Sequence, residues 1–103
     1  MPDTLVHSRY CIRRDWPAIL AIEEATFGGW GEADLASLWK RKEVAGRVAL
    51  ACEQIVGFIF YELIPGRVRV LNLAAVTPGA RAELIEKVRE AAYAGHRRLV
   101  WCG

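Results

Sequence analysis

Three consecutive segments in the middle of the chain have the hydrophobic patterns of strands. Residues 47–53 alternate apolar and polar side chains, which is the period of a half-buried strand. Residues 55–64 are almost continuously apolar, as expected of a central strand that is covered on both faces. Pro65 and Gly66 then turn the chain into residues 67–76. We predict three antiparallel strands joined by tight turns.

The C-terminal part of the chain predicts a helix followed by another strand. Apolar side chains recur at helical spacing over residues 80–94, and Gly95 is suited to end this helix in a left-handed conformation. Residues 97–102 then have the composition of a strand. Because a strand, a helix and a strand in succession form a right-handed crossover, residues 67–76 and 97–102 should be parallel neighbours.

The N-terminal part predicts a strand and two helices. The strand covers residues 9–14, and Asp15 follows it as the expected cap of a helix that runs to about residue 27. The glycine-rich segment 28–31 separates this helix from a second one over residues 32–42. The first helix is expected to bury Trp16, Ile19, Leu20 and Phe27 and to expose Glu23 and Glu24.

The composition indicates a single folded domain over residues 1–103. The apolar fraction is 53% and the net charge is +2, which argue against disorder and give no field that attracts nucleic acid. No apolar run approaches the length of about 18 residues that a membrane span needs. The N-terminus lacks the basic and apolar regions of a secretory signal. We therefore expect a cytoplasmic protein with no membrane or nucleic-acid partner.

The cysteines and histidines suggest no reactive or metal site. Cys11, Cys52 and Cys102 are too widely spaced for a disulfide framework or a zinc site. His7 and His96 have no evident partner in the sequence. We expect three buried, reduced thiols and no bound metal.

The junction at residues 71–81, where a strand leads into a helix, has two interpretations. The free N–H groups of a helix's first turn favour anions, so this junction is a candidate phosphate site. The residues that would form it are Gly79, Ala80 and Arg81. Alternatively, Thr77 and Pro78 only cap the helix, because proline is favoured in a first turn.

Several other polar side chains each have a functional and a structural interpretation. Glu62 is either a base in a cleft or an exposed carboxylate at a strand end. Glu23 and Glu24 either attract a cationic amine or are simply solvated. Tyr61 and Tyr93 either donate a proton or pack in the core.

The glycine-rich loop and the C-terminal arginines also have a functional and a structural interpretation each. Trp30 either lines a pocket or anchors its loop to the core. Arg97 and Arg98, together with Arg67 and Arg69, either form a small basic patch for a phosphate or are solvated at the sheet edge.

Four short segments, in the predicted order of elements, carry a family resemblance. They are residues 9–19, Phe27 with Trp30 and Leu35, residues 51–58 and residues 73–78. Together they resemble the GCN5-related N-acetyltransferase (GNAT) superfamily, and they are most similar to the branch that acetylates the N-termini of ribosomal proteins.

This resemblance implies an α/β (α+β) fold with a mixed sheet and the element order β-α-α-β-β-β-α-β. The family usually continues with a further helix and strands, which this sequence lacks. It also implies acetyl-CoA as the cofactor, with its pantetheine arm bound to a bulge at the end of the fourth strand and its diphosphate held by a glycine-rich loop. The implied cofactor-binding residues are Leu73, Ala74, Ala75, Val76, Gly79, Ala80 and Arg81. Most of the loop is missing here, which implies a shortened member with a degenerate diphosphate site.

The resemblance leaves two functions open. Family members often carry a basic carboxylate on the fourth strand and an acidic tyrosine after the fifth, but residues 67–73 contain no carboxylate and Gly103 ends the sequence. We expect a degenerate domain with weak or no acetyl-CoA binding, which acts as a homodimer through its C-terminal edge strand. The alternative is an active acetyl-CoA-dependent N-acetyltransferase on a small-molecule or protein amine. No catalytic residue is assigned.

Overall fold

A mixed five-stranded sheet forms the centre of residues 5–101, the part of the chain that the computed structural model describes. Its strands are β1 (Val6–Tyr10), β2 (Val44–Ala51), β3 (Gln54–Ile64), β4 (Arg67–Ala75) and β5 (Arg98–Trp101). They lie in this order across the sheet, and all neighbours are antiparallel except β4 and β5, which are parallel. The predicted hairpins and the parallel crossover are confirmed.

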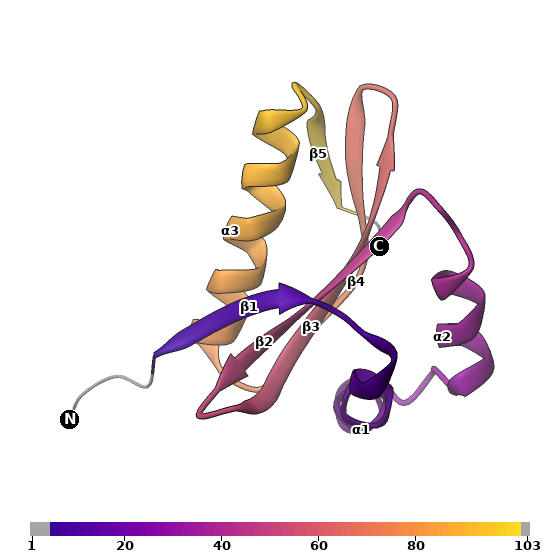
Figure 1. The fold of residues 1–103 in the computed structure, drawn as a ribbon, viewed down its shortest axis with the longest axis vertical. Helices are drawn as coiled ribbons and strands as arrows, with labels where there is room; N and C mark the ends of the chain where they lie inside the picture. Colours follow the sequence, from indigo (N-terminus) through magenta and orange to yellow (C-terminus); the bar gives the residue numbers. More distant parts are fainter. Residues whose placement is uncertain (1–4, 102–103) are drawn as a thin grey trace.

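Three helices cover the two faces of the sheet. They are α1 (Trp16–Thr26), α2 (Glu32–Trp39) and α3 (Pro78–Ala94), and a short 3-10 turn, η1 (Arg13–Asp15), precedes α1. Helix α3 packs on one face, while α1 and α2 lie on the other (Figure 1). Within residues 5–101, the helices are too short or too polar to cross a membrane. The predicted mixed α/β architecture and its element order are confirmed.

The apolar run of β3 supplies both hydrophobic layers. Phe58 and Phe60 face α1 and α2, Ile59 and Tyr61 face α3, and none of the four is more than 2% exposed. Trp30 packs its ring against both phenylalanines, with centroids 6.2 and 5.7 Å away. Each large buried apolar side chain contributes about 1.5–3 kcal/mol. Strand β3 therefore joins the two layers, and Trp30 anchors its loop to one of them, as one interpretation predicted.

Strand β1 lies nearer the N-terminus than the predicted strand over residues 9–14. All five of its residues pair with β2, and the chain leaves the sheet after Tyr10. Cys11 then turns into the hydrophobic layer beneath α1. Of the predicted strand residues after Tyr10, only Cys11 is buried, and residues 12–14 are exposed outside the sheet.

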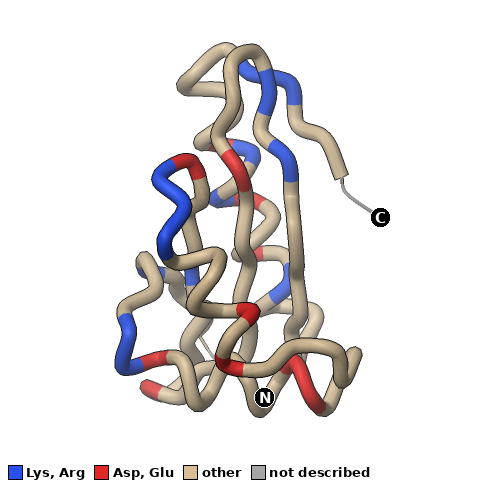
Figure 2. Tube along the Cα trace, turned by 90° about the vertical axis from the view of Figure 1, so that its right-hand side faces the viewer, with Lys and Arg blue, Asp and Glu red and all other residues tan. Residues whose placement is uncertain are grey.

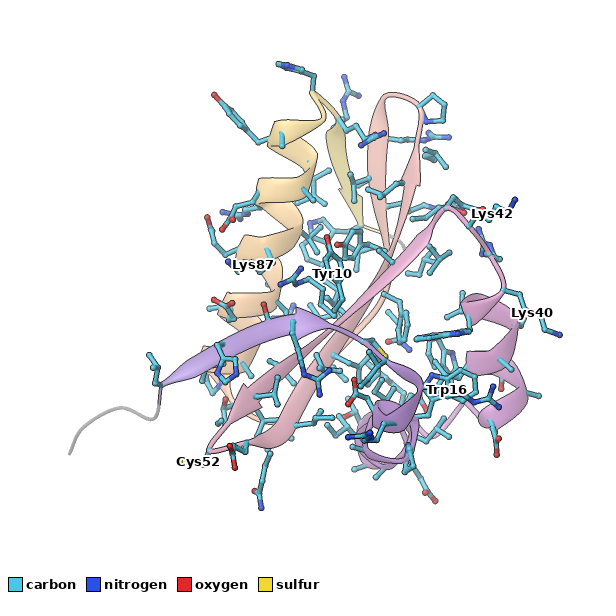
Figure 3. The ribbon with its side chains drawn as sticks, in the orientation of Figure 1. Tyr10, Trp16, Lys40, Lys42, Cys52 and Lys87 are labelled. Carbon is cyan, nitrogen blue, oxygen red and sulfur yellow. The ribbon has the colours of Figure 1, made fainter. Side chains whose placement is uncertain are left out.

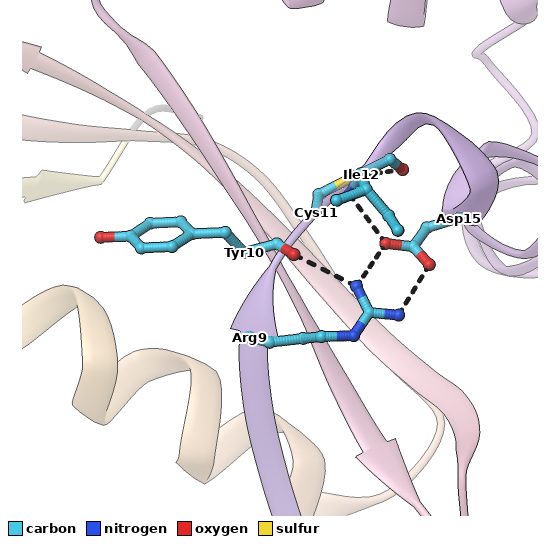
Figure 4. Close-up of polar contacts among 5 residues, drawn as sticks. All are labelled: Arg9, Tyr10, Cys11, Ile12 and Asp15. Carbon is cyan, nitrogen blue, oxygen red and sulfur yellow. Dashed lines mark hydrogen bonds and ion pairs between the residues drawn. The ribbon is translucent and has the colours of Figure 1, made fainter.

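Asp15 holds the connection between β1 and α1 through its side chain. Its carboxylate accepts hydrogen bonds from both terminal nitrogens of Arg9, at 2.7 and 2.8 Å, and from the Ile12 N–H at 2.9 Å (Figure 4). Asp15 occupies the N-cap position of α1, as predicted, but its side chain makes no hydrogen bond to the helix. The Arg9 guanidinium holds the pKa of Asp15 below its ordinary value, although burial opposes this shift.

We expect Asp15→Asn to lower the free energy of unfolding by about 1.5–3 kcal/mol at neutral pH, since it weakens hydrogen bonds to a charged group. The folded-state pKa of Asp15 is lowered, so its contribution is present above the unfolded-state pKa of about 3.9 and is lost as the pH falls through the folded-state value. Urea unfolding of both proteins from neutral to acidic pH measures the difference. A difference that persists unchanged at pH 2 would contradict this role of the ion pair.

Two turns place residues other than glycine in the left-handed region. Cys52 and Glu53 have φ of 51° and 65° in the turn between β2 and β3, and His96 has φ of 53° after α3. The predicted left-handed cap at Gly95 is wrong, because Gly95 has φ of −92°. Left-handed residues of this kind cost about 1 kcal/mol or more and persist where the flanking elements require them.

The expectation of three buried thiols holds only in part. Cys11 is buried, and burial raises the pKa of its thiol to about 12. Cys52 is exposed at the tip of the β2–β3 turn (Figure 3). Cys102 lies outside the described residues. The tight turn forces Cys52 outward, since a two-residue hairpin loop has no core to bury it.

Candidate functional site

A cleft opens where β4 and β5 cease to pair. Within residues 5–101 their pairing ends at Val70 opposite Trp101, whereas β4 continues to Ala75. The cleft has a volume of about 490 Å³. Its lining comes from α1, the segment after α1, β4, α3 and β5: Glu23, Phe27, Val70, Leu71, Asn72, Leu73, Arg81 and Trp101. Because α1 and α3 cover opposite faces of the sheet (Figure 1), residues from both sides of the sheet line the cleft.

A bulge in β4 lies at the start of this cleft. Phe60 is opposite Asn72 and Tyr61 is opposite Val70, so Leu71 is an extra residue on β4. Sequence reasoning expected the bulge closer to the helix, among residues 73–76. A bulge increases the local twist of a strand and leaves backbone groups unpaired. The bulge at Leu71 follows directly after Val70, the last residue of β4 that pairs with the described part of β5.

The backbone of β4 beyond the bulge presents polar groups to the cleft side. The Val76 N–H donates to the Val56 carbonyl of β3 at 2.7 Å. Successive residues of a strand direct their backbone groups to opposite neighbours, so those of Leu73 and Ala75 are directed away from β3. No strand within residues 5–101 pairs with them there. They are therefore free to bind the amides of an extended ligand.

The cleft gathers part of the predicted cofactor site. Leu73 and Arg81 are in its lining. The other five predicted residues lie outside the lining, either on β4 or near the start of α3: Ala74, Ala75, Val76, Gly79 and Ala80. The binding role of all seven residues stays a prediction.

Thr77 occupies the start of α3 as a helix cap. Its Oγ1 accepts from the Ala80 N–H and its carbonyl accepts from the Arg81 N–H, both at 3.1 Å. Pro78 has no N–H. Gly79 therefore holds the one N–H of this first turn that has no acceptor among the described residues. The capping interpretation is confirmed, and an anion at this helix would meet only Gly79 and the Arg81 side chain.

Glu23 is a buried carboxylate in the wall of the cleft. It is 2% exposed, and its Oε1 accepts from the Gly29 N–H at 3.0 Å and from the Trp30 N–H at 2.9 Å. Its Oε2 has no hydrogen bond to any residue in the described part of the chain. The prediction that Glu23 is solvated is wrong, whereas Glu24 is exposed as expected. Phe27, predicted to be buried, is 60% exposed beside the same cleft.

Glu62 is a second buried carboxylate, and neither interpretation from the sequence, a base in a cleft or an exposed strand-end group, describes it. It is 4% exposed, and its two oxygens accept from Arg69 at 2.6 Å and from Arg41. Arg69 is therefore engaged in an ion pair within the basic region that β4 and β5 form at one end of the molecule (Figure 2). Arg67 and Arg98 are neighbours there in the parallel register. A phosphate patch at this end stays a prediction.

The tyrosines considered as proton donors lie outside the cleft. Tyr61 is buried beneath α3, and burial raises the pKa of its hydroxyl above the ordinary value. Tyr93, predicted to pack in the core, is 86% exposed near the end of α3. Among residues 5–101, no three His, Cys, Asp or Glu side chains gather to bind a metal ion. The polar or charged side chains of the described cleft lining are Glu23, Asn72 and Arg81.

Comparison by sequence finds no relative, since no protein-family model and no curated protein matches the chain. Comparison by structure finds N-acetyltransferases. A ribosomal-protein-alanine N-acetyltransferase from Brucella melitensis biovar Abortus 2308 is 17% identical with a TM-score of 0.75, over 96% of this chain and 80% of that one. The corresponding enzyme from Escherichia coli is 16% identical, also with a TM-score of 0.75, over 84% of this chain and 59% of that one.

An aminoglycoside N-acetyltransferase in complex with CoA is similar as well. It is 15% identical with a TM-score of 0.77, and the match covers 99% of this chain and 79% of that chain. The chain therefore has the fold of the GCN5-related N-acetyltransferases, over about four fifths of the length of two of these neighbours.

Proposed function

We propose that this domain is an acetyl-CoA-dependent N-acetyltransferase that binds its cofactor mainly through the acetyl-pantetheine arm. The observation that carries the proposal is the cleft that begins where β4 and β5 cease to pair. An extended arm with amide groups suits the free backbone groups of Leu73 and Ala75. Bound acetyl-CoA would supply an activated acetyl thioester for transfer to an amine.

The diphosphate of the cofactor fits the chain less well. Strand β4 ends at Ala75 and α3 begins at Pro78, so no glycine-rich loop separates them. The Ala80 N–H, which such an anion would need, already donates to Thr77. A phosphate at this helix gains the dipole and the Arg81 charge but few hydrogen bonds. We therefore expect weak binding of the nucleotide half.

Thermal unfolding with fragments of the cofactor tests this proposal. We expect acetyl-CoA and S-acetylpantetheine to bind with similar dissociation constants and adenosine 3′,5′-bisphosphate to have no effect. A ligand at about one hundred times its dissociation constant stabilises by about 2.7 kcal/mol, which raises the Tm of a domain this small by about 10 °C or more. If adenosine 3′,5′-bisphosphate raises the Tm and S-acetylpantetheine does not, the acetyl-pantetheine arm is not the main contact, and the proposal is contradicted.

A variant pair localises the effect to the cleft. Asn72→Trp places a large ring in the lining and should abolish the shift, whereas Tyr93→Trp adds the same ring at a remote, exposed position and should preserve it. No shift with millimolar acetyl-CoA in the unmodified protein would overturn the proposal. That result favours the second candidate function, a degenerate domain that acts through protein contacts.

The second candidate has one supporting observation of its own. Strand β5 is at the edge of the sheet, and its Trp101 is 49% exposed. An edge strand with apolar side chains can pair with another chain, and a symmetric copy of itself is the simplest partner. The homodimer through β5 thus stays a prediction that is compatible with either function.

A further inference from the structure

The edge of β2 is uncovered where β1 leaves the sheet. Pairing between the two strands ends at Tyr10, and one further bond joins the Cys11 N–H to the Gly46 carbonyl at 2.8 Å. Strand β2 begins two residues before Gly46, at Val44. Within residues 5–101, no strand pairs with Val44 on the β1 side. The part of β2 that a longer β1 would cover is therefore an open sheet edge.

This open edge presents one backbone donor and one backbone acceptor. The Gly46 N–H has no acceptor among the described residues, although the Gly46 carbonyl is bonded to Cys11. Backbone groups alternate in direction along a strand, so the Val44 carbonyl is directed to the same side as that of Gly46. In a parallel pair, a single residue of the added strand bonds to such a donor and acceptor through its own carbonyl and N–H. The edge can therefore accept an extended peptide.

An apolar groove lies beside the open edge and is large enough for one side chain. Its volume is about 260 Å³. Most of its lining comes from α2, β2 and β3, and we call it the β2 edge groove: Cys11, Leu38, Trp39, Val44, Gly46 and Phe60. The Phe60 ring lies so close to Gly46 that a Cβ there would be 2.5 Å from it. The groove thus combines an apolar pocket with free backbone groups, the two features that recognise an added strand.

Two lysines without an ion-pair partner adjoin the β2 edge groove. Lys40 and Lys42 follow Trp39 in the chain, and both are exposed on the α2 side of the molecule (Figure 3). Neither forms an ion pair with any residue in the described part of the chain. The neighbouring carboxylate of Glu43 is already paired with Arg41 at 2.9 Å. The rim of the groove is therefore positively charged.

Aromatic contacts connect a third cation to the same rim. The rings of Trp39 and Trp16 meet edge to face with centroids 5.4 Å apart, and the Arg13 guanidinium lies 4.8 Å from the Trp16 centroid. Arg13 is exposed, and it too has no ion-pair partner within residues 5–101. It also lines a second groove with Glu32, without pairing with it. Trp39, which is 42% exposed, thus lies between the lysines and an arginine.

We propose that the β2 edge groove binds an extended, acidic peptide segment of a partner protein. The peptide backbone would pair with the Gly46 N–H and the Val44 carbonyl, and one apolar side chain would fill the groove. Flanking carboxylates would lie near Lys40 and Lys42, which gives the peptide its preferred charge. The backbone groups favour a peptide over a nucleic acid, because only a peptide can extend a sheet. The proposal is independent of the acetyltransferase, since this groove and the β4–β5 cleft have no lining residue in common.

The experiment is an NMR titration of the unmodified protein with capped heptapeptides. The first peptide has a central leucine among glutamates. It should shift the Gly46 amide signal in a saturable way and slow the solvent exchange of that N–H, which gains an acceptor. Replacing the leucine with glycine should weaken binding by about tenfold or more, because a buried leucine contributes about 1.5–3 kcal/mol. A peptide with lysines in place of the glutamates should leave the signal unchanged.

Three results of this titration would overturn the proposal. The first is no saturable shift with the acidic leucine peptide. The second is an equal shift with the acidic and the basic peptide, because the cations would then have no role in recognition. The third is a saturable shift with an oligothymidylate but not with the acidic peptide, which would assign this surface to a nucleic acid.

A matched pair of double variants tests the positive rim. Lys40→Glu together with Lys42→Glu should weaken binding of the acidic peptide by about tenfold or more. Lys87→Glu together with Arg89→Glu reverses two charges on α3, on the other face of the sheet, and should change the dissociation constant less than twofold (Figure 3). Equal losses in the two double variants would reflect net charge alone and overturn the proposal. If the first double variant does not fold, the peptide comparison on the unmodified protein still decides.

Discussion

Replacing Arg41 and Arg69 together with methionine should destabilise the domain by about 3–5 kcal/mol, because it leaves the buried carboxylate of Glu62 without a counter-charge. Both arginines are partly exposed, whereas the Glu62 side chain is 5% exposed. The carboxylate therefore carries the desolvation cost. Chemical unfolding measures the free energy, and the Tm should fall by about 12 °C or more.

Two controls define the cause of this loss. Adding Glu62→Leu to the double variant removes the buried charge and should restore the stability of the unmodified protein or exceed it, since an apolar cluster can replace a buried ion pair. Lys87→Met removes a solvent-exposed partner of Glu90, 3.8 Å away, and should cost less than about 1 kcal/mol. A double variant as stable as the unmodified protein would show that water already satisfies Glu62.

Inserting a five-residue glycine-rich loop before Pro78, together with Thr77→Gly, should tighten acetyl-CoA binding by at least about tenfold. The substitution removes the Oγ1 that accepts from the Ala80 N–H, and the loop supplies further N–H groups for the diphosphate. One hydrogen bond to a charged phosphate contributes about 1.5–3 kcal/mol, which is enough for this change. Calorimetric titration gives the dissociation constant directly.

The controls for the insertion vary the ligand and the loop. S-acetylpantetheine lacks the diphosphate and should bind both proteins equally well. An insertion of the same length built from alternating proline and valine cannot direct successive N–H groups at one anion, and it should give no gain for acetyl-CoA. Equal gains from the two insertions would contradict the view that the diphosphate contacts are what this chain lacks.

The local patterns of the chain predict the fold well. Strands β3 and β4 and helix α3 form continuous segments with one period each, and their neighbours in sequence are also their neighbours in space. Strand β1 was predicted at residues 9–14 but lies at Val6–Tyr10. Its position was harder to predict because its partner β2 lies more than thirty residues away, so no local turn fixes its register. Long-range pairing was thus the weaker part of the prediction.

The candidate site was harder to predict, for a reason that Glu23 and Glu62 share. Each carboxylate is buried because groups outside its own helix or strand satisfy it: Glu23 accepts from Gly29 and Trp30 beyond the end of its helix, and Glu62 is paired with Arg41, which lies 21 positions away. The hydrophobic pattern of a single helix or strand contains the acid without these partners. The one available signal was the glycine-rich segment after α1, whose exposed N–H groups need an acceptor.

The unequal attachment of the strands has a consequence for amide hydrogen exchange. Strand β3 is paired along both edges, whereas β5 joins the sheet at only four positions of β4. Amides in β3 should therefore exchange only when the whole domain unfolds, and those of β5 should exchange through local opening. The β5 wall of the cleft is thus its rapidly exchanging part. Slower exchange at Leu99 and Val100 should be the first sign of an occupant.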